Sequence, residues 1–176
     1  MTDAKDRDGV SVPELPALLD TLESELRREI ARLGLANPAM IGIHSGGVWI
    51  AEHLHRRLGL SEPLGKLDIS FYRDDFSQIG LQPRVRASNL PFAVEGRDIL
   101  LIDDVLHTGR TIRAALNEIF DYGRPARVLL GVLIERNGRQ IPIRADCRGA
   151  ALELPPGQRI KLSGPDPLAL EIRHAR

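Results

Sequence analysis

Residues 98–120 read DILLIDDVLHTGRTIRAALNEIF, an apolar run joined to a helical pattern by a short polar turn. The run at 99–102 (ILLI) has no polar alternation, which is typical of a strand covered on both faces of a sheet. Apolar residues at helical spacing then predict a buried helix face, made of Ile112, Ala115, Leu116, Ile119 and Phe120. A second apolar run at 128–134 (VLLGVLI) follows Gly123, which ends the helix. Strand, helix and strand with short links predict a parallel sheet with right-handed crossovers.

The segments before this unit continue the same α/β pattern. Apolar residues recur at helical spacing from 13 to 33 and predict an amphipathic helix that ends near Gly34. A buried strand is expected at 40–44, and a helix is expected at 48–58 after a tight glycine turn. Residues 66–72 (KLDISFY) alternate between apolar and polar, which predicts a half-exposed strand.

Two stretches carry weaker signals. Residues 73–94 are polar and lack a sustained period, so we expect a long loop or hairpin of the kind that often forms a lid. The tail contains short apolar runs that are consistent with strands, at 152–154, 160–162 and 168–172. We expect a disordered tail over residues 1–10, followed by a single domain over 11–176.

Length and charge limit the classes of function. The chain has 176 residues, enough for one domain with a real core. Its 24 Lys and Arg residues balance its 24 Asp and Glu residues, and zero net charge gives no overall attraction to nucleic acid or anionic membranes. Cys147 is the only cysteine, so no internal disulfide can form. No signal peptide or membrane-spanning run is evident, and we expect a cytoplasmic protein.

Asp103 and Asp104 follow the ILLI strand directly. In open parallel sheets, ligands bind beyond the carboxyl ends of the strands, which is where this acidic pair is expected. Two adjacent carboxylates are costly there unless a ligand or a protein group pairs with them. Each carboxylate can accept hydrogen bonds, so the pair suits the two hydroxyls of a ribose.

The turn after the acidic pair suits a phosphate. Gly109 permits a tight or left-handed turn, and the backbone N–H groups at the helix start converge on one point. Thr108 and Thr111 add hydroxyl donors. The segment therefore offers a diol site and a phosphate site in succession, as a 5-phosphoribosyl group requires. An ordinary capped turn without a ligand is the alternative, whereas the P-loop and G-x-G-x-x-G motifs are absent.

This segment resembles the phosphoribosyl pyrophosphate (PRPP) signature of type I phosphoribosyltransferases, and the chain as a whole resembles the PyrR family. The matching stretches are LDISFYRDDFS (67–77), ILLIDDVLHTGRTIRAAL (99–116), YGRP (122–125) and VLIERNGRQIPIRAD (132–146). The resemblance implies a type I phosphoribosyltransferase fold, with a central mostly parallel sheet flanked by helices, a lid loop near 73–94 and a small hood from about 136 to 176. It also implies Mg²⁺, a homodimer or homotetramer, and conversion of uracil and PRPP to UMP and pyrophosphate. Regulation of pyrimidine genes through leader mRNA is the family's second implied role.

The resemblance also assigns roles to residues. Asp103 and Asp104 are the expected catalytic carboxylates, and Mg²⁺ is expected to bind through PRPP with these two residues as possible ligands. The 5-phosphate is assigned to the turn, namely Val105, Leu106, His107, Thr108, Gly109, Arg110 and Thr111. Pyrophosphate and the lid are assigned Ser45, Gly46, Arg73 and Arg84. Relatives typically carry Thr-Arg-Gly where this chain has Ser45-Gly46-Gly47, and loss of that charged contact costs about 1.5–3 kcal/mol, so turnover is expected to be weak.

The base and RNA sites depart further from the family pattern. The base is assigned Leu106, Ile134 and Arg136, but relatives usually carry Asp-Arg-Gly-His where this chain has 135–138, ERNG. Arg139 and Arg144 match basic positions of the family's RNA face. Three hypotheses therefore stand: a uracil phosphoribosyltransferase with a regulatory role, a nucleotide-sensing regulator with little or no catalysis, and a phosphoribosyltransferase for another base.

Overall fold

The protein is described by a computed structural model that covers residues 10–70 and 87–174. The elements in chain order are α1 (Leu15–Leu33), β1 (Ala39–Ile43), α2 (Gly46–Leu58), β2 (Gly65–Leu67), β3 (Asp98–Leu106), α3 (Arg110–Tyr122), β4 (Arg127–Arg136), β5 (Cys147–Leu152), β6 (Gln158–Ser163) and β7 (Ala169–His174).

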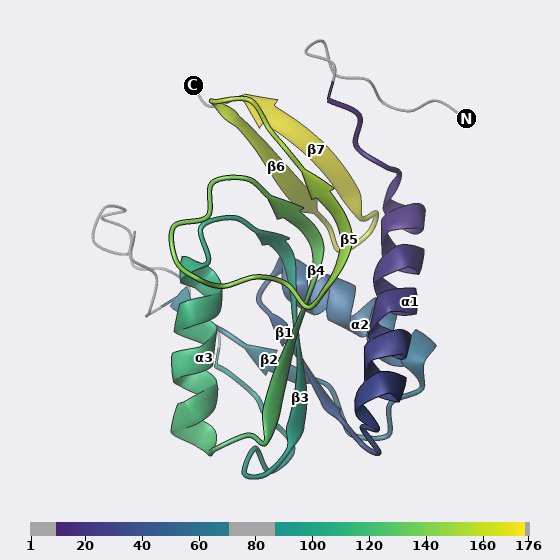
Figure 1. Cartoon of the computed structure of the whole chain (residues 1–176), viewed down its shortest axis with the longest axis vertical. Helices are drawn as coiled ribbons and strands as arrows, with labels where there is room; N and C mark the ends of the chain where they lie inside the picture. Colours follow the sequence, from purple (N-terminus) through teal and green to yellow (C-terminus); the bar gives the residue numbers. More distant parts are fainter. Residues whose placement is uncertain (1–9, 71–86, 175–176) are drawn as a thin grey trace.

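The core of the fold is a five-stranded sheet in the order β2-β1-β3-β4-β5, and every neighbouring pair is parallel. Helices α1 and α2 cover one face, and α3 covers the other (Figure 1). Strands β6 and β7 form a separate antiparallel hairpin. The predicted α/β fold, a parallel sheet flanked by helices, is confirmed.

Alternate residues of each strand feed two separate cores. In β1 and β3, Met40 and Leu100 point into the core beneath α1 and α2. Their neighbours Ile41 and Leu101 point into the core beneath α3. All four side chains are fully buried. This two-sided burial explains why the strands read as unbroken apolar runs.

The expected helices all form, with small differences at their ends. Helix α1 ends at Gly34 as predicted, and α2 begins at Gly46 instead of at 48. The placement of Phe120 on the buried face of α3 was wrong, because its side chain is 54% exposed. Ile119 is fully buried, and the next residue is rotated by about 100° around the helix, away from the sheet.

The predicted strand at 66–72 was wrong in extent. Only β2 (Gly65–Leu67) pairs with β1, and Asp68 is buried instead of facing solvent. Its carboxylate accepts hydrogen bonds from the backbone N–H and the hydroxyl of Ser70, and its own N–H donates to Ser88 Oγ at 3.0 Å. Side-chain hydrogen bonds therefore replace the sheet ladder beyond Leu67.

The strand expected at 99–102 is longer than predicted, since β3 continues to Leu106 and contains the acidic pair. In the tail, β6 and β7 overlap the runs at 160–162 and 168–172, whereas the run at 152–154 contributes only its first residue, to β5. Residues 73–86 of the expected lid lie outside the described residues, and 87–94 contains no helix or longer strand. None of the helices that the structure describes could cross a membrane.

Gly42 in β1 controls how closely α2 approaches the sheet. A Cβ at this position would lie 2.8 Å from the Val48 Cα and 2.9 Å from the Gly47 carbonyl oxygen, both backbone atoms of α2. We expect Gly42→Ala to lower the free energy of unfolding by about 1–3 kcal/mol in urea titrations, because backbone atoms must move.

Gly131 in β4 is the matched control for this substitution. A Cβ there would meet the Ile102 Cδ1 at 3.0 Å, the end of a side chain that can turn aside. Gly131→Ala should therefore cost clearly less than Gly42→Ala. Equal losses for the two variants would contradict the assignment of Gly42 as the contact that seats α2.

Candidate functional site

The acidic pair lies near the end of strand β3, where backbone N–H groups hydrogen-bond its side chains. Asp103 is only 5% exposed, and Asp104 is half-buried. The Asp104 N–H donates to Asp103 Oδ1, and the Val105 N–H donates to Asp104 Oδ1, both at 2.9 Å. Each carboxylate is thus oriented locally by a backbone donor, which offsets part of the cost of burying it.

The loop between β1 and α2 lies directly against this pair. A Cβ at Gly47 would be 2.6 Å from the Ile102 carbonyl oxygen and 3.0 Å from the Asp103 Cα. A Cβ at Gly46 would collide with the carboxylate of Asp104. The structure therefore brings the predicted pyrophosphate loop, Ser45–Gly47, and the predicted ribose carboxylates into one site.

The contact of Gly46 with Asp104 affects how the missing arginine at position 46 is interpreted. Any side chain at position 46 must first displace the Asp104 carboxylate. An arginine placed there would meet that carboxylate before it reached a ligand, so Gly46→Arg is not a simple repair of the loop. Gly46 and Asp104 form a matched pair in this chain.

The predicted phosphate turn is a tight corner at the start of α3. Gly109 has φ +93° and is buried, and a Cβ there would lie 2.8 Å from Ile141 Cγ1. Both the left-handed backbone and the lack of space require glycine. The Arg110 N–H donates to Thr108 Oγ1 at 3.2 Å, which holds the threonine hydroxyl at the helix N-terminus. The positive end of the helix dipole at this corner favours a bound anion.

A segment after β4 braces the turn from outside. The Thr108 carbonyl oxygen accepts hydrogen bonds from the N–H groups of Gln140, at 3.0 Å, and Ile141, at 3.3 Å. The Arg110 Nε donates to Gln140 Oε1 at 2.9 Å. The side chain of Arg110 is therefore tied to the brace.

Two of the residues predicted for the base lie apart. Leu106 is buried in the core beneath α3, whereas Ile134 is fully buried in the core beneath α1 and α2. They therefore point to opposite faces of the sheet and do not form one wall. His107, which was assigned to the phosphate, lies against Gly138.

Arg136, at the end of β4, is half-buried and holds the β6–β7 hairpin. Its Nη1 donates to the Gln158 carbonyl oxygen at 3.1 Å, and its Nε donates to the Asn137 carbonyl oxygen at 3.3 Å. Burial lowers the pKa of this guanidinium, and the nearby charge of Arg159 lowers it further. The guanidinium remains charged at neutral pH, since an arginine does not lose its proton in proteins.

Sequence reasoning missed the role of Asn137. Its side chain donates to the Leu154 carbonyl oxygen and accepts from the Leu154 N–H, each at 3.0 Å. Its own N–H donates to the Leu152 carbonyl oxygen at 3.2 Å. Asn137 thus extends the β4–β5 ladder by one step. An asparagine after a strand gives no signal of such a clamp in the sequence.

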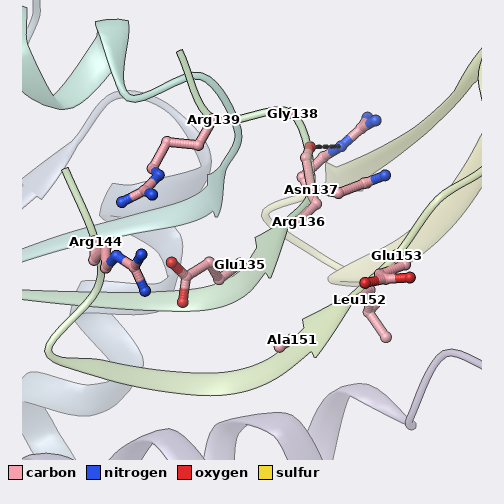
Figure 2. Close-up of a pocket in the computed structure, with 9 residues that line it drawn as sticks. All are labelled: Glu135, Arg136, Asn137, Gly138, Arg139, Arg144, Ala151, Leu152 and Glu153. Atoms are coloured by element: carbon pink, nitrogen blue, oxygen red, sulfur yellow. Dashed lines mark hydrogen bonds between the residues drawn. The ribbon is translucent and has the colours of Figure 1, made fainter. Parts of the chain in front are cut away.

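The two arginines predicted for RNA line one open pocket of about 410 Å³ beside the ends of β4 and β5 (Figure 2). Arg139 and Arg144 enter it from the loop after β4, and Glu135 and Arg144 point toward one another across it. Glu135 also pairs with Arg148 at 2.6 Å, and Glu153 adds a second carboxylate. The pocket is of mixed charge.

The other assigned residues have limited support from geometry. Arg73 and Arg84 lie outside the described residues. Within residues 10–70 and 87–174, no three His, Cys, Asp or Glu side chains gather as a metal cage would require. A metal ion at Asp103 and Asp104 would therefore depend on oxygen ligands from a substrate or from water.

Comparison with known proteins identifies relatives of this arrangement. A family model described as "Phosphoribosyl transferase domain" matches residues 11–153. A protein of Pseudomonas aeruginosa strain LESB58 named "Bifunctional protein PyrR" is 56% identical over 162 residues, 92% of this chain and 95% of that protein. A protein of the same name from Nitrosococcus oceani is 54% identical, over 91% of this chain and 92% of that protein.

Solved structures support the fold. A hypoxanthine-guanine phosphoribosyltransferase from Bacillus anthracis matches with a TM-score of 0.65, at 13% identity, over 80% of this chain and 82% of that chain. A hypoxanthine phosphoribosyltransferase from Staphylococcus aureus matches with a TM-score of 0.61, at 19% identity, over 78% and 74%. At these identities the likeness concerns the fold alone.

Cys147 is the one thiol of the chain, and its chemistry can be predicted from its position in β5. The side chain is fully buried, and burial, with the charges of Glu25, Glu29 and Asp146, raises the pKa of the thiol to about 12. We expect no reaction of the native protein with a disulfide reagent at mildly alkaline pH, because the thiolate is the reactive form. Full reaction should follow unfolding in urea. Rapid reaction of the folded protein would contradict the buried, protonated state.

Proposed function

The chain belongs to the PyrR family of phosphoribosyltransferases, and we propose that it transfers the phosphoribosyl group of PRPP to uracil and regulates pyrimidine genes in response to nucleotides. The products of the transfer are UMP and pyrophosphate. The observation that carries the proposal is the contact of loop Ser45–Gly47 with Asp103 and Asp104 beside the turn Thr108–Thr111. Together, the loop, the two carboxylates and the turn offer donors for pyrophosphate, carboxylates for the ribose diol and a helix N-terminus for the 5-phosphate.

The proposed chemistry is a substitution at the anomeric carbon. The bond from this carbon to pyrophosphate breaks with its electron pair on the leaving group, and the N1 lone pair of uracil forms the new bond while the N1 proton is lost to solvent. Positive charge develops on the ribose ring, as in other glycosyl transfers. The carboxylates of Asp103 and Asp104, already oriented by backbone N–H groups, would stabilise that charge.

Magnesium fits this donor set as a cofactor shared with the substrate. Asp103 and Asp104 supply adjacent carboxylate oxygens, the ligand type that Mg²⁺ prefers. When bound, Mg²⁺ would neutralise charge on the pyrophosphate and ribose oxygens.

The pyrophosphate half of the site is the weaker half. Backbone N–H groups of the loop remain available as donors, but Gly46 provides no side-chain charge. We therefore propose slow turnover with intact nucleotide binding. A sensor of UMP or PRPP that regulates genes with little catalysis is the second candidate, and the same observation favours it.

The proposed regulatory partner is the leader of pyrimidine messenger RNA, and Arg139 and Arg144 are its proposed contacts. Their convergence on one open pocket supports this proposal. Glu135 and Glu153 in the same pocket reduce its positive charge, so we expect weak and strongly salt-dependent binding. Assembly as a homodimer or homotetramer in the cytoplasm is also part of the proposal, as is the predicted hood over 136–176.

The enzymatic proposal is tested by incubating the protein with labelled uracil, PRPP and Mg²⁺ and measuring UMP. We expect measurable UMP from the native chain and a loss of about 10²–10³-fold in kcat for Asp103→Asn, which removes a negative charge without changing shape. Asp166→Asn, an exposed carboxylate in the β6–β7 turn, is the matched control and should keep full activity. No UMP at high enzyme concentration would exclude the transferase, and GMP formed from guanine instead would overturn the choice of uracil.

The regulatory proposal is tested by gel shift with a pyrimidine leader RNA, with and without UMP. Arg144→Ala should weaken binding and reduce the slope of log affinity against log salt by about one, as loss of one phosphate contact does. Arg32→Ala is the control, because Arg32 is exposed on α1 and pairs locally with Glu29. Equal effects of the two variants, or no binding at low salt, would remove the pocket from the RNA site.

A further inference from the structure

The His107 side chain occupies an unusual place at the end of the sheet. His107 follows Leu106, the last residue of β3, which pairs in parallel register with Glu135 of β4. A Cβ added to Gly138 would lie 2.7 Å from His107 Nε2 and 3.0 Å from its Cδ2. The imidazole therefore leans across the end of β4 and fills the space that Gly138 leaves open.

The ring of His107 packs against Gly138. No residue within 10–70 or 87–174 forms a hydrogen bond with either ring nitrogen. Its side chain is accessible to solvent, so a ligand can reach it. A histidine with both nitrogens available beside a substrate site can donate one hydrogen bond and accept another.

The surroundings of the ring keep it neutral. Burial lowers the pKa of the His107 imidazole, and the charges of Arg136 and Arg159 lower it further. Since an ordinary histidine already titrates below neutral pH, this ring is uncharged at neutral pH. A neutral imidazole near two guanidinium groups can bind an uncharged polar molecule such as a nucleobase.

The direction of the substrate across the sheet places the base beside this ring. The proposed ribose carboxylates lie at the end of β3, and the proposed pyrophosphate loop approaches them from β1, on one side. The incoming base attacks the anomeric carbon from the face opposite to the leaving pyrophosphate. It therefore lies on the other side of β3, over the end of β4, where His107, Arg136 and Gly138 meet.

We propose that His107, seated against Gly138, forms the side wall of the base site and hydrogen-bonds the nucleobase, instead of contacting the 5-phosphate. This inference rests on the proposed phosphoribosyl site but not on catalysis. It makes His107 a specificity-determining residue, and it makes Gly138 the residue that admits its ring.

The inference is tested by titration calorimetry with UMP, GMP and ribose 5-phosphate, which share the phosphoribosyl group and differ in the base. We expect His107→Phe, which keeps a ring without hydrogen bonding, to weaken UMP by about fivefold and to change ribose 5-phosphate by less than about twofold. His107→Gln, which can still donate and accept, should keep UMP binding within about twofold of the native chain. His53→Phe, in the second half of α2 where His53 contacts Arg57, is the matched control and should change neither ligand.

Each other outcome decides against the inference. Unchanged UMP binding in His107→Phe, or an equal loss for UMP and ribose 5-phosphate, would return His107 to the phosphate site or to no site. Native-like UMP binding in His107→Phe, together with a loss in His107→Gln, would show that ring shape matters and hydrogen bonding does not. Native protein that binds neither nucleotide better than ribose 5-phosphate would remove base recognition altogether.

Failure of the proposed function would look different. Preference of the native chain for GMP over UMP would overturn the pyrimidine assignment, while the same His107→Phe loss, now measured with GMP against ribose 5-phosphate, would still support the base wall. Absence of UMP synthesis would leave the calorimetry unaffected, because it measures binding and not turnover.

Discussion

The close approach of the β1–α2 loop to the end of β3 is the contact on which the site depends. Two glycines make it possible, since a side chain at Gly47 would strike the β3 backbone and one at Gly46 would strike the Asp104 carboxylate. The same approach seats α2, because Gly42 lets the helix lie directly on β1. Steric exclusion, more than any single attraction, thus sets the distance between the two proposed halves of the PRPP site.

The rest of the site is assembled from the carboxyl ends of adjacent parallel strands. A parallel sheet brings these ends to one edge whatever the loops contain, and β1, β3 and β4 each deliver one part there. Backbone atoms perform much of the positioning: N–H groups orient the acidic pair, and the Thr108 carbonyl oxygen anchors the brace from Gln140 and Ile141. This explains how the site can keep its shape where the side chains depart from the family pattern.

Sequence reasoning recovered the parallel α/β fold and the helices because burial on two faces leaves a strong periodic signal. It shortened β3, since charged residues such as Asp103 look like the end of a buried strand, and it lengthened β2, since Asp68 alternates correctly but is satisfied by Ser70 and Ser88. It assigned Leu106 and Ile134 to one base site, although they lie on opposite faces of the sheet. The contacts of Asn137, and of Gly138 with His107, join strand ends that no local pattern connects.

The β6–β7 hairpin is held on the sheet by the buried side chains of Ile160 and Leu162 and by main-chain hydrogen bonds. Arg136 donates a hydrogen bond to the Gln158 carbonyl oxygen. The Asn137 side chain hydrogen-bonds both the N–H and the carbonyl oxygen of Leu154, just before the hairpin. Hydrogen bonds to main-chain atoms do not depend on which side chains the held segment carries. The outward-facing residues of the hairpin, Arg159 among them, can therefore change without unseating it. Such changes would alter the charge near His107 while the proposed catalytic edge of the sheet stays fixed.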